Sequence, residues 1–104
     1  MAQVYFWEEA QKDYKKLDGI LKQWVDAAEE RLKIRGSEIG KSLGNTNYAK
    51  LAGFKELKNQ KLGIRLIFKP SVNGKIEIIE IVTIGKRDEE KVFITAEKRR
   101  VKRQ

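Results

Sequence analysis

The sequence predicts a single α+β domain over residues 1–104, with two N-terminal helices packed on one face of a small, mostly antiparallel sheet and a C-terminal helix. Three observations lead to this fold class. Apolar residues within 19–35 recur at the spacing of an amphipathic helix. Residues 75–84 form an apolar run typical of a strand, and Asn73-Gly74 is a strong hairpin signal. A chain of 104 residues and 12.1 kDa is expected to form one compact domain.

The N-terminal half is expected to hold a strand and two helices. Residues 2–7 are rich in aromatic and β-branched side chains, which favour a strand. The first helix, 8–17, opens with two glutamates that complement the helix dipole. Asp18 is the expected N-cap of the second helix and Gly36 its end. The glycines within 36–50 then indicate a connecting loop.

The C-terminal half changes to a strand pattern. Residues 54–59 and 62–69 are expected to be strands that precede the strand at 75–84. Asp88 is the expected N-cap of a last helix, with two glutamates in its first turn. The element order is therefore β-α-α-β-β-β-α, which is typical of an α+β domain.

A two-residue turn at Asn73-Gly74 would fix the register of the hairpin. The expected pairs are Val72 with Lys75, Phe68 with Ile79, Leu66 with Ile81 and Arg65 with Val82. Because side chains alternate between the faces of a sheet, one face is expected to hold Ile64, Leu66, Phe68, Ile79 and Ile81. The opposite face is expected to hold Arg65, Lys69, Glu80, Val82 and Ile84.

Arg65 on that second face has two interpretations. Arg87 lies just past the strand, and two arginines on one surface can hold a phosphate through bidentate hydrogen bonds. Alternatively, Arg65 forms a structural ion pair with Glu80 across the sheet, and the residues alone favour this reading. A buried unpaired guanidinium is costly, so the face is expected to be open or concave.

The charge is uneven along the chain. Lysine and arginine number 23 and aspartate and glutamate 15, so the formal net charge is +8. Residues 54–104 hold fourteen basic and seven acidic side chains, and this excess attracts phosphates or an acidic protein. A basic surface without a specific ligand is the alternative. The run Lys98–Arg103 is either a solvated helix end or a contact for RNA or an acidic partner.

The composition also excludes several classes of function. The chain has no cysteine and no histidine, which rules out disulfides, thiolate nucleophiles, cysteine-bound zinc and histidine acid–base catalysis. No segment approaches the ~20 apolar residues of a membrane span, and the N-terminal residues lack the pattern of a signal peptide. We therefore expect a cytoplasmic protein that uses no metal and no small-molecule cofactor.

Two short motifs carry a family resemblance. Gly-Ile-Arg-Leu at 63–66 is followed by Gly-Lys-Arg at 85–87, and then by Val92-Phe93. Over roughly residues 53–100 the chain resembles the RelE/ParE superfamily of bacterial toxin–antitoxin toxins, on the RelE/HigB side. The N-terminal strand and helices agree with that family in order and length but carry no distinctive motif.

The resemblance implies a ribosome-dependent endoribonuclease that cuts mRNA in the decoding site, where the 2′-OH of the RNA attacks the adjacent phosphate without a metal. Arg65 and Arg87 would stabilise the charged phosphorane, and Lys58 would be a second basic contact or proton carrier. The implied partners are a cognate antitoxin, mRNA and the ribosome. Further candidates for contact with RNA are Lys55, Lys69, Lys86, Lys98 and Arg99.

Two residues depart from the family pattern. Phe93 stands where RelE-type enzymes have a tyrosine as a candidate general base, and phenylalanine cannot transfer a proton. Glu56 stands where the family has a lysine. Glu56 either serves as a base or is a solvated strand residue, and the second interpretation is favoured. Two other functions stay open, a ParE-like inhibitor of DNA gyrase and a catalytically silent relative that binds a partner or operator DNA.

Overall fold

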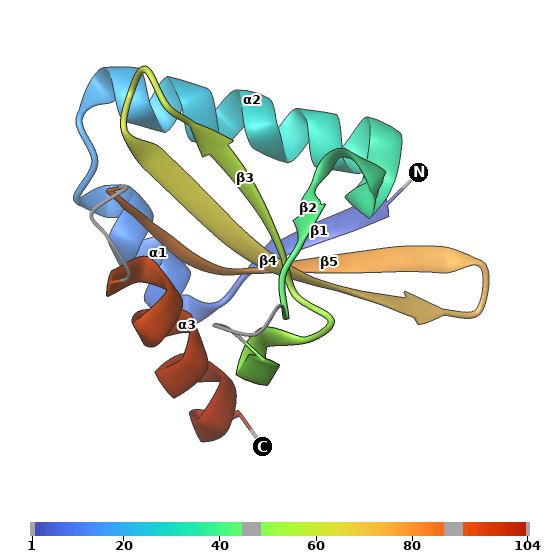
Figure 1. Cartoon of the computed structure of the whole chain (residues 1–104). Coiled ribbons are helices and arrows are strands. Elements are labelled where there is room, and N and C mark those ends of the chain that lie inside the picture. The colour runs from blue at the N-terminus through green and yellow to red at the C-terminus, as the bar shows by residue number, and fades with distance from the viewer. Residues whose placement is uncertain (1, 45–48, 87–90, 104) are drawn as a thin grey trace.

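The structure is a computed structural model that describes residues 2–44, 49–86 and 91–103. Figure 1 shows a twisted sheet with helices on both sides. The elements in chain order are β1 (Ala2–Phe6), α1 (Glu8–Lys15), α2 (Gly19–Arg35), the 3₁₀ turn η1 (Gly36–Ile39), β2 (Lys41–Ser42), the 3₁₀ turn η2 (Ala49–Leu51), β3 (Lys55–Asn59), β4 (Ile64–Asn73), β5 (Ile76–Lys86) and α3 (Lys91–Lys102).

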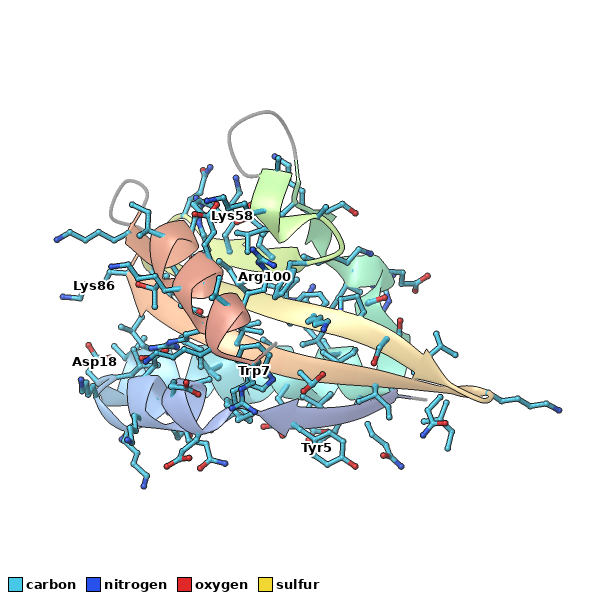
Figure 2. The ribbon with its side chains drawn as sticks, turned by 90° about the horizontal axis from the view of Figure 1, so that it is seen from below. Tyr5, Trp7, Asp18, Lys58, Lys86 and Arg100 are labelled. Carbon is cyan, nitrogen blue, oxygen red and sulfur yellow. The ribbon has the colours of Figure 1, made fainter. Side chains whose placement is uncertain are left out.

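The sheet of the described residues has five strands in the order β1-β5-β4-β3-β2. β1 runs parallel to β5, and the other neighbours are antiparallel. In Figure 1, α2 lies along one face of the sheet and α3 on the other, and Figure 2, seen from below, has α3 in front. The expected α+β class and element order are confirmed. The residues expected to form a loop also contribute the short edge strand β2.

The second helix forms as its sequence predicts. The side chain of Asp18 accepts a hydrogen bond from the backbone N–H of Leu21 (3.0 Å), which caps the first turn. Gly36 ends the helix with φ 76°, a conformation that favours glycine. One stripe of α2 is buried against the sheet: Leu21, Val25, Ala28 and Leu32.

The first helix lies beside the edge of β5 beyond the end of β1. The backbone N–H of Trp7 donates to the carbonyl of Ile81 (2.9 Å), which is the last contact of the β1 side with β5. Farther along β5, the N–H of Ile84 donates to the Asp13 carboxylate on α1 (3.1 Å). This edge of β5 is therefore covered first by a strand and then by a helix, which limits edge-to-edge pairing with other chains.

The central hairpin differs in register from the expectation. The pairing ends at Asn73 and Ile76, so the two-residue turn is Gly74-Lys75 and Val72 pairs with Glu77. Gly74 has φ 66° at the first turn position, where a tight hairpin turn needs glycine. The expectation that Asn73-Gly74 forms the two-residue turn is therefore wrong. Phe68 consequently pairs with Ile81 instead of Ile79. The slip is by two residues, so each side chain keeps its face here.

A second change occurs in the middle of the hairpin. The register shifts between Ile67 and Phe68, where β5 contains one extra residue. Beyond this bulge Leu66 pairs with Ile84 and Arg65 with Gly85, so the expected pairs of Leu66 with Ile81 and Arg65 with Val82 are wrong. The extra residue also moves Ile84 to the face of Leu66, away from the face of Arg65 where it was expected.

The core is divided between the two faces of the sheet. Ile64, Leu66 and Phe68 are fully buried on the α2 side. Ile67 points to the other face, where α3 contributes the buried apolar residues Val92, Phe93 and Ala96. Burial of an apolar side chain such as Val92 or Phe93 contributes about 1.5–3 kcal/mol. Helix α3 is therefore a structural part of the domain, and it also forms one wall around Arg65.

Candidate functional site

Arg65 and Lys58 lie opposite each other on neighbouring strands. They are register partners between β4 and β3, so both side chains are on the face that α3 covers. The Arg65 side chain is 12% exposed, and Lys58 is exposed at the rim. Figure 2 labels Lys58 beside the N-terminal part of α3. The pairing of strands alone therefore brings two of the expected site residues together.

Glu56 is the acidic partner of Arg65. Its Oε2 lies 3.3 Å from Nη1 of Arg65, and its side chain is only 5% exposed. The expectation of an ion pair between Arg65 and Glu80 is wrong, because Glu80 instead accepts a hydrogen bond from the Trp7 indole N–H (2.9 Å). The interpretation of Glu56 as a solvated strand residue is also wrong. Two strand positions separate Glu56 from Lys58, so alternation places both on the face of Arg65.

Phe93 forms an apolar wall of the site. The Cζ atom of Arg65 lies 4.6 Å from the centre of the Phe93 ring, which is a cation–π contact. The guanidinium thus has an aromatic ring as one neighbour and a carboxylate as another. Within the described part of the chain, neither Glu56 Oε2 nor Arg65 Nε has a hydrogen-bond partner of good geometry. Unpaired polar atoms in a buried place favour a further polar ligand.

The end of β5 leads to the other expected arginine. Gly85 is the register partner of Arg65, and Lys86 closes the strand as an exposed residue. Arg87 follows by one residue but lies outside the described residues. Its expected convergence with Arg65 therefore remains a prediction.

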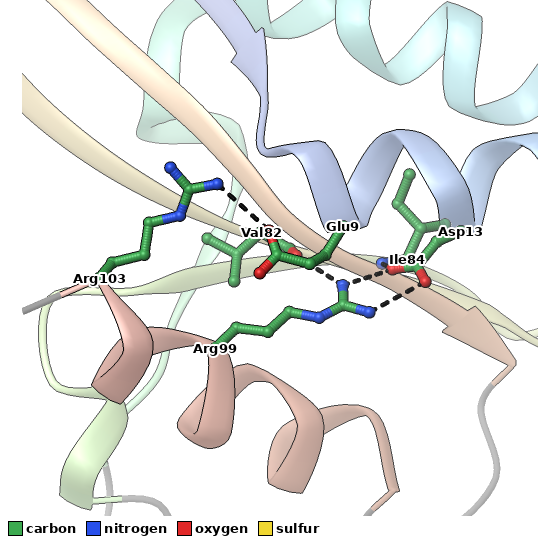
Figure 3. Close-up of polar contacts among 6 residues, drawn as sticks. All are labelled: Glu9, Asp13, Val82, Ile84, Arg99 and Arg103. Atoms are coloured by element: carbon green, nitrogen blue, oxygen red, sulfur yellow. Dashed lines mark hydrogen bonds and ion pairs between the residues drawn. The ribbon is translucent and has the colours of Figure 1, made fainter.

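The remaining candidates for RNA contact are distributed over different surfaces. Lys69 is exposed on the same face as Arg65, and Lys98 is exposed on α3. Lys55 lies on the opposite face, where its Nζ donates to the carbonyl of Ser37 (2.7 Å). Arg99 donates to the Asp13 carboxylate and to the carbonyl of Val82, as Figure 3 shows. Of these two lysines, Lys69 therefore shares a face of the sheet with Arg65, and Lys55 does not.

The described residues contain no metal site and no candidate membrane helix. They include no group of three acidic, histidine or cysteine side chains that could hold a metal ion. None of the helices described is long and apolar enough to cross a membrane. The charged side chains described beside Arg65 are the cation Lys58 and the carboxylate Glu56.

Comparison with known proteins gives a match in structure. No protein-family model and no curated protein matches the sequence. The free Escherichia coli toxin RelE, as a mutant with two arginines changed to alanine, aligns with TM-score 0.71 at 22% identity over 95% of this chain and 98% of that chain. The toxin–antitoxin complex RelBE2 from Mycobacterium tuberculosis aligns with TM-score 0.63 at 24% identity over 84% and 93%. The chain has the RelE toxin fold.

The same fold is found in a more distant toxin. The YoeB/ParE toxin from Agrobacterium tumefaciens aligns with TM-score 0.62 at 12% identity, over 81% of this chain and 97% of that chain. The RelE-like fold implied by the sequence resemblance is thereby confirmed. It places β3, β4, the end of β5 and α3 around one face, which is the face that holds Arg65, Lys58, Glu56 and Phe93.

A second group of cations on this RelE-like chain is not evident from the sequence alone. A hollow of about 250 Å³ lies between α3 and the segment that follows η2. It is lined by the four cations Lys50, Lys69, Arg100 and Arg103 together with Trp7, Ala52 and Phe54. We call it the α3–η2 groove. In the sequence, Arg100 and Arg103 belong to the basic run Lys98–Arg103 and Lys69 is a separate candidate, and no local pattern brings them together with Lys50.

Arg103 at this groove is also paired with an acid. Its Nη2 lies 3.2 Å from Oε1 of Glu9, and its Cζ lies 4.3 Å from the centre of the Trp7 ring. The pKa of Glu9 is lowered, first by a hydrogen bond from its own backbone N–H and then by Arg103, against the opposite effect of burial. Glu9 is therefore ionised and holds Arg103 over Trp7 at neutral pH.

Proposed function

We propose that this chain is the toxin of a toxin–antitoxin pair and that it cuts mRNA on the ribosome. The observation that carries the proposal is the grouping of Arg65, Lys58 and Glu56 on one face of a RelE fold, beside the strand end that leads to Arg87. Such a grouping supplies cations to a phosphate and a carboxylate to a hydroxyl. It requires no metal, no histidine and no cysteine.

The reaction is an internal attack by the RNA on its own backbone. The 2′-oxygen forms a bond to the adjacent phosphorus, and the bond from phosphorus to the 5′-oxygen of the next nucleotide breaks. The products are a 2′,3′-cyclic phosphate and a 5′-hydroxyl. Arg65, together with Arg87, stabilises the extra negative charge of the phosphorane, which is usually the largest catalytic contribution of such a site. Lys58 provides the proton for the departing 5′-oxygen.

Glu56 is the proposed base in place of the missing tyrosine. Phe93 has no transferable proton, whereas the Glu56 carboxylate lies against Arg65 and its Oε2 lacks a hydrogen-bond donor among the described residues. When a phosphate binds to Arg65, the guanidinium turns its N–H groups towards the phosphate oxygens. Glu56 then becomes free to accept the proton of the 2′-OH. The Phe93 ring limits the positions that the guanidinium can take.

An antitoxin partner is part of the same proposal. One of the similar structures, RelBE2, is a complex of a toxin with its antitoxin. The chain carries a net charge of +8, and the last turn of α3 contains Arg99, Arg100 and Lys102. We infer that an acidic antitoxin segment binds this end of the molecule. Its association rate is expected to fall as salt is added.

The test is cleavage of a defined mRNA in a reconstituted translation reaction, with a parallel reaction that lacks ribosomes. The expected result is fragmentation only in the translating reaction. Intact mRNA with continued translation would contradict the proposal. Inhibition of supercoiling in a gyrase assay at low protein concentration would then favour the ParE-like function. No effect in either assay would favour a silent, partner-binding relative.

A further inference from the structure

The α3–η2 groove collects four cations from three different elements. Lys50 is on η2, Lys69 on β4 and Arg100 on α3, and Arg103 directly follows the last residue of α3. Figure 2 labels Arg100 between α3 and the η2 segment, and Trp7 near the C-terminal end of α3. These residues are distant in the sequence, so the fold itself gathers the positive charge. Cations from several elements around one hollow favour an anionic ligand.

The acids near the groove do not balance these cations. Glu9 is paired with Arg103, and Glu80 is the register partner of Lys69 and also accepts the Trp7 indole N–H. Within residues 2–44, 49–86 and 91–103, neither Lys50 nor Arg100 has an acidic partner within 4.0 Å. In addition, Arg100 Nε is buried and has no hydrogen-bond partner there. An unpaired buried donor is costly, and an anion in the groove would satisfy it.

The two aromatic rings that line the groove, Trp7 and Phe54, are not available for stacking with a nucleobase. Trp7 and Phe54 are 5% and 4% exposed, so their ring faces are not offered to solvent. Arg103 already occupies the upper side of the Trp7 ring at 4.3 Å. A nucleobase therefore has no free ring face in this groove, whereas a phosphate can pair with the cations that line it. The groove fits a phosphate group better than a base.

The groove lies on the same face of the sheet as Arg65. Lys69 is four residues beyond Arg65 on β4, and side chains four apart in a strand share a face. At the rise of a β-strand the two Cα atoms are about 13 Å apart. A ligand that reaches both positions is a linear chain with repeated negative charges. Single-stranded nucleic acid has this property, because a charged groove can follow its backbone.

We propose that the α3–η2 groove binds a second phosphodiester of the RNA strand whose scissile phosphate lies at Arg65. This inference rests on the proposed function for the position of the scissile phosphate at Arg65, but the binding of RNA to the groove can be measured without cleavage. Phosphate contacts position a nucleic acid without reading its sequence. The groove thus fixes the strand so that the phosphate to be cut lies beside Arg65 and Glu56.

The test compares two double variants with equal change of charge. Lys69→Gln/Arg100→Gln removes two cations from the groove, and Arg31→Gln/Lys75→Gln removes two exposed cations from α2 and the hairpin turn. Thermal unfolding of both variants checks that they are folded. If the first variant unfolds, Lys50→Gln/Lys69→Gln replaces it, since both of those lysines are exposed.

The probe is a fluorescent, 2′-O-methylated single-stranded RNA of about ten nucleotides, which has no free 2′-OH for the attack. The dinucleotide of the same chemistry is the short probe. The groove variant is expected to bind the long RNA about tenfold more weakly than wild type at low salt, and the dinucleotide equally well. Its negative slope of log K against log salt concentration is expected to become shallower by about 1.4, or about 0.7 for each lost contact. The control variant is expected to resemble wild type.

Several results would overturn the proposal. Equal loss of long-RNA affinity in both variants would mean that only net charge matters. Unchanged RNA binding together with weaker binding of a polyglutamate peptide would assign the groove to an acidic protein. The proposed function is judged separately, by cleavage of translated mRNA. If wild type fails to cut mRNA but the groove variant loses long-RNA affinity, the proposed function is wrong, whereas the binding of an RNA phosphate by the groove stands. If Arg65→Ala abolishes cleavage while the groove variant binds like the control, the groove is wrong and the function stands.

Discussion

The guanidinium of Arg99 on α3 holds the carboxylate of Asp13 on α1 through two hydrogen bonds of 2.6 and 3.1 Å. The same carboxylate accepts the backbone N–H of Ile84, and Arg99 also donates to the carbonyl of Val82 (Figure 3). Bidentate pairs of this kind combine charge with fixed geometry. Three elements, α1, β5 and α3, are therefore joined at one point. This contact holds α3 over the face that contains Arg65.

Replacing Asp13 tests this junction. Asp13→Asn keeps the size of the side chain but removes the charge that compensates Arg99, whose side chain is only 16% exposed. We expect the free energy of unfolding to fall by about 3 kcal/mol, because a partly buried charge loses its partner. The measurement is urea denaturation. Glu38→Gln, at a 67% exposed side chain, is the control, and it is expected to change stability by less than about 0.5 kcal/mol. Equal effects of the two substitutions would contradict the role of the junction.

Replacing Arg65 tests the proposed phosphate contact. Arg65→Ala is expected to lower the rate of mRNA cleavage by about 10²–10³ because the phosphorane loses a charged donor. Arg31→Ala, at an exposed position on α2, removes the same charge and should leave the rate unchanged. The measurement is the rate of mRNA loss in a translation reaction, with circular dichroism to show that both variants are folded. Full activity of folded Arg65→Ala would remove Arg65 from the mechanism.

Glu56→Gln separates a base from a simple counter-ion. The amide retains the shape of the side chain and can still accept a hydrogen bond from Arg65, but it cannot accept the proton of the 2′-OH. We expect cleavage to slow by at least about 10², while the 2′-O-methylated RNA binds at least as tightly because a negative charge has been removed. Binding and cleavage are measured on the same preparation. A rate equal to or above that of wild type would mean that Glu56 only balances the charge of Arg65.

The sequence predicts the helices better than it predicts the hairpin. The spacing of apolar residues and the cap at Asp18 depend on neighbours in the chain, and both are found in the structure. The hairpin register depends on which position of the turn Gly74 occupies, and on an extra residue in β5. Gly74 can occupy either position of a two-residue turn without a steric clash, so the register is decided by the packing of the whole sheet.

The site could be predicted only in part for a similar reason. Arg65 and Lys58 follow from motif position, and strand pairing then brings them together. The burial of Glu56 depends on packing with residues that are not its neighbours in the sequence, among them Arg65 on β4. Likewise Arg99 and Asp13 are 86 positions apart. Arg99 resembles an RNA contact in the sequence because no local pattern indicates its acidic partner.

Glu9 gives a pH dependence with a definite sign. Its pKa is lowered from 4.5, so the ionised form is favoured in the folded state. Ionised Glu9 therefore stabilises the folded protein at pH values above 4.5. This contribution is lost as the pH falls through the lowered pKa of the folded protein. In Glu9→Gln the contribution is absent, so the difference in unfolding free energy from wild type should shrink as the pH falls below 4.5.

Unfolding in urea at a series of pH values measures that difference. Arg103→Gln is the matched variant, and it should reduce the pH dependence without abolishing it, because the backbone hydrogen bond of Glu9 remains. A difference between Glu9→Gln and wild type that stays constant with pH would contradict the assignment.

The most direct test of the central claim is the chemistry of the RNA ends that the protein produces. Primer extension on mRNA from a cell-free translation reaction maps new 5′ ends, and phosphorylation by polynucleotide kinase reports whether they carry a hydroxyl. We predict new 5′-hydroxyl ends within translated codons, absent without ribosomes and absent with Arg65→Ala. Intact mRNA in the translating reaction, or ends that carry a 5′-phosphate, would contradict cleavage by the 2′-OH at Arg65.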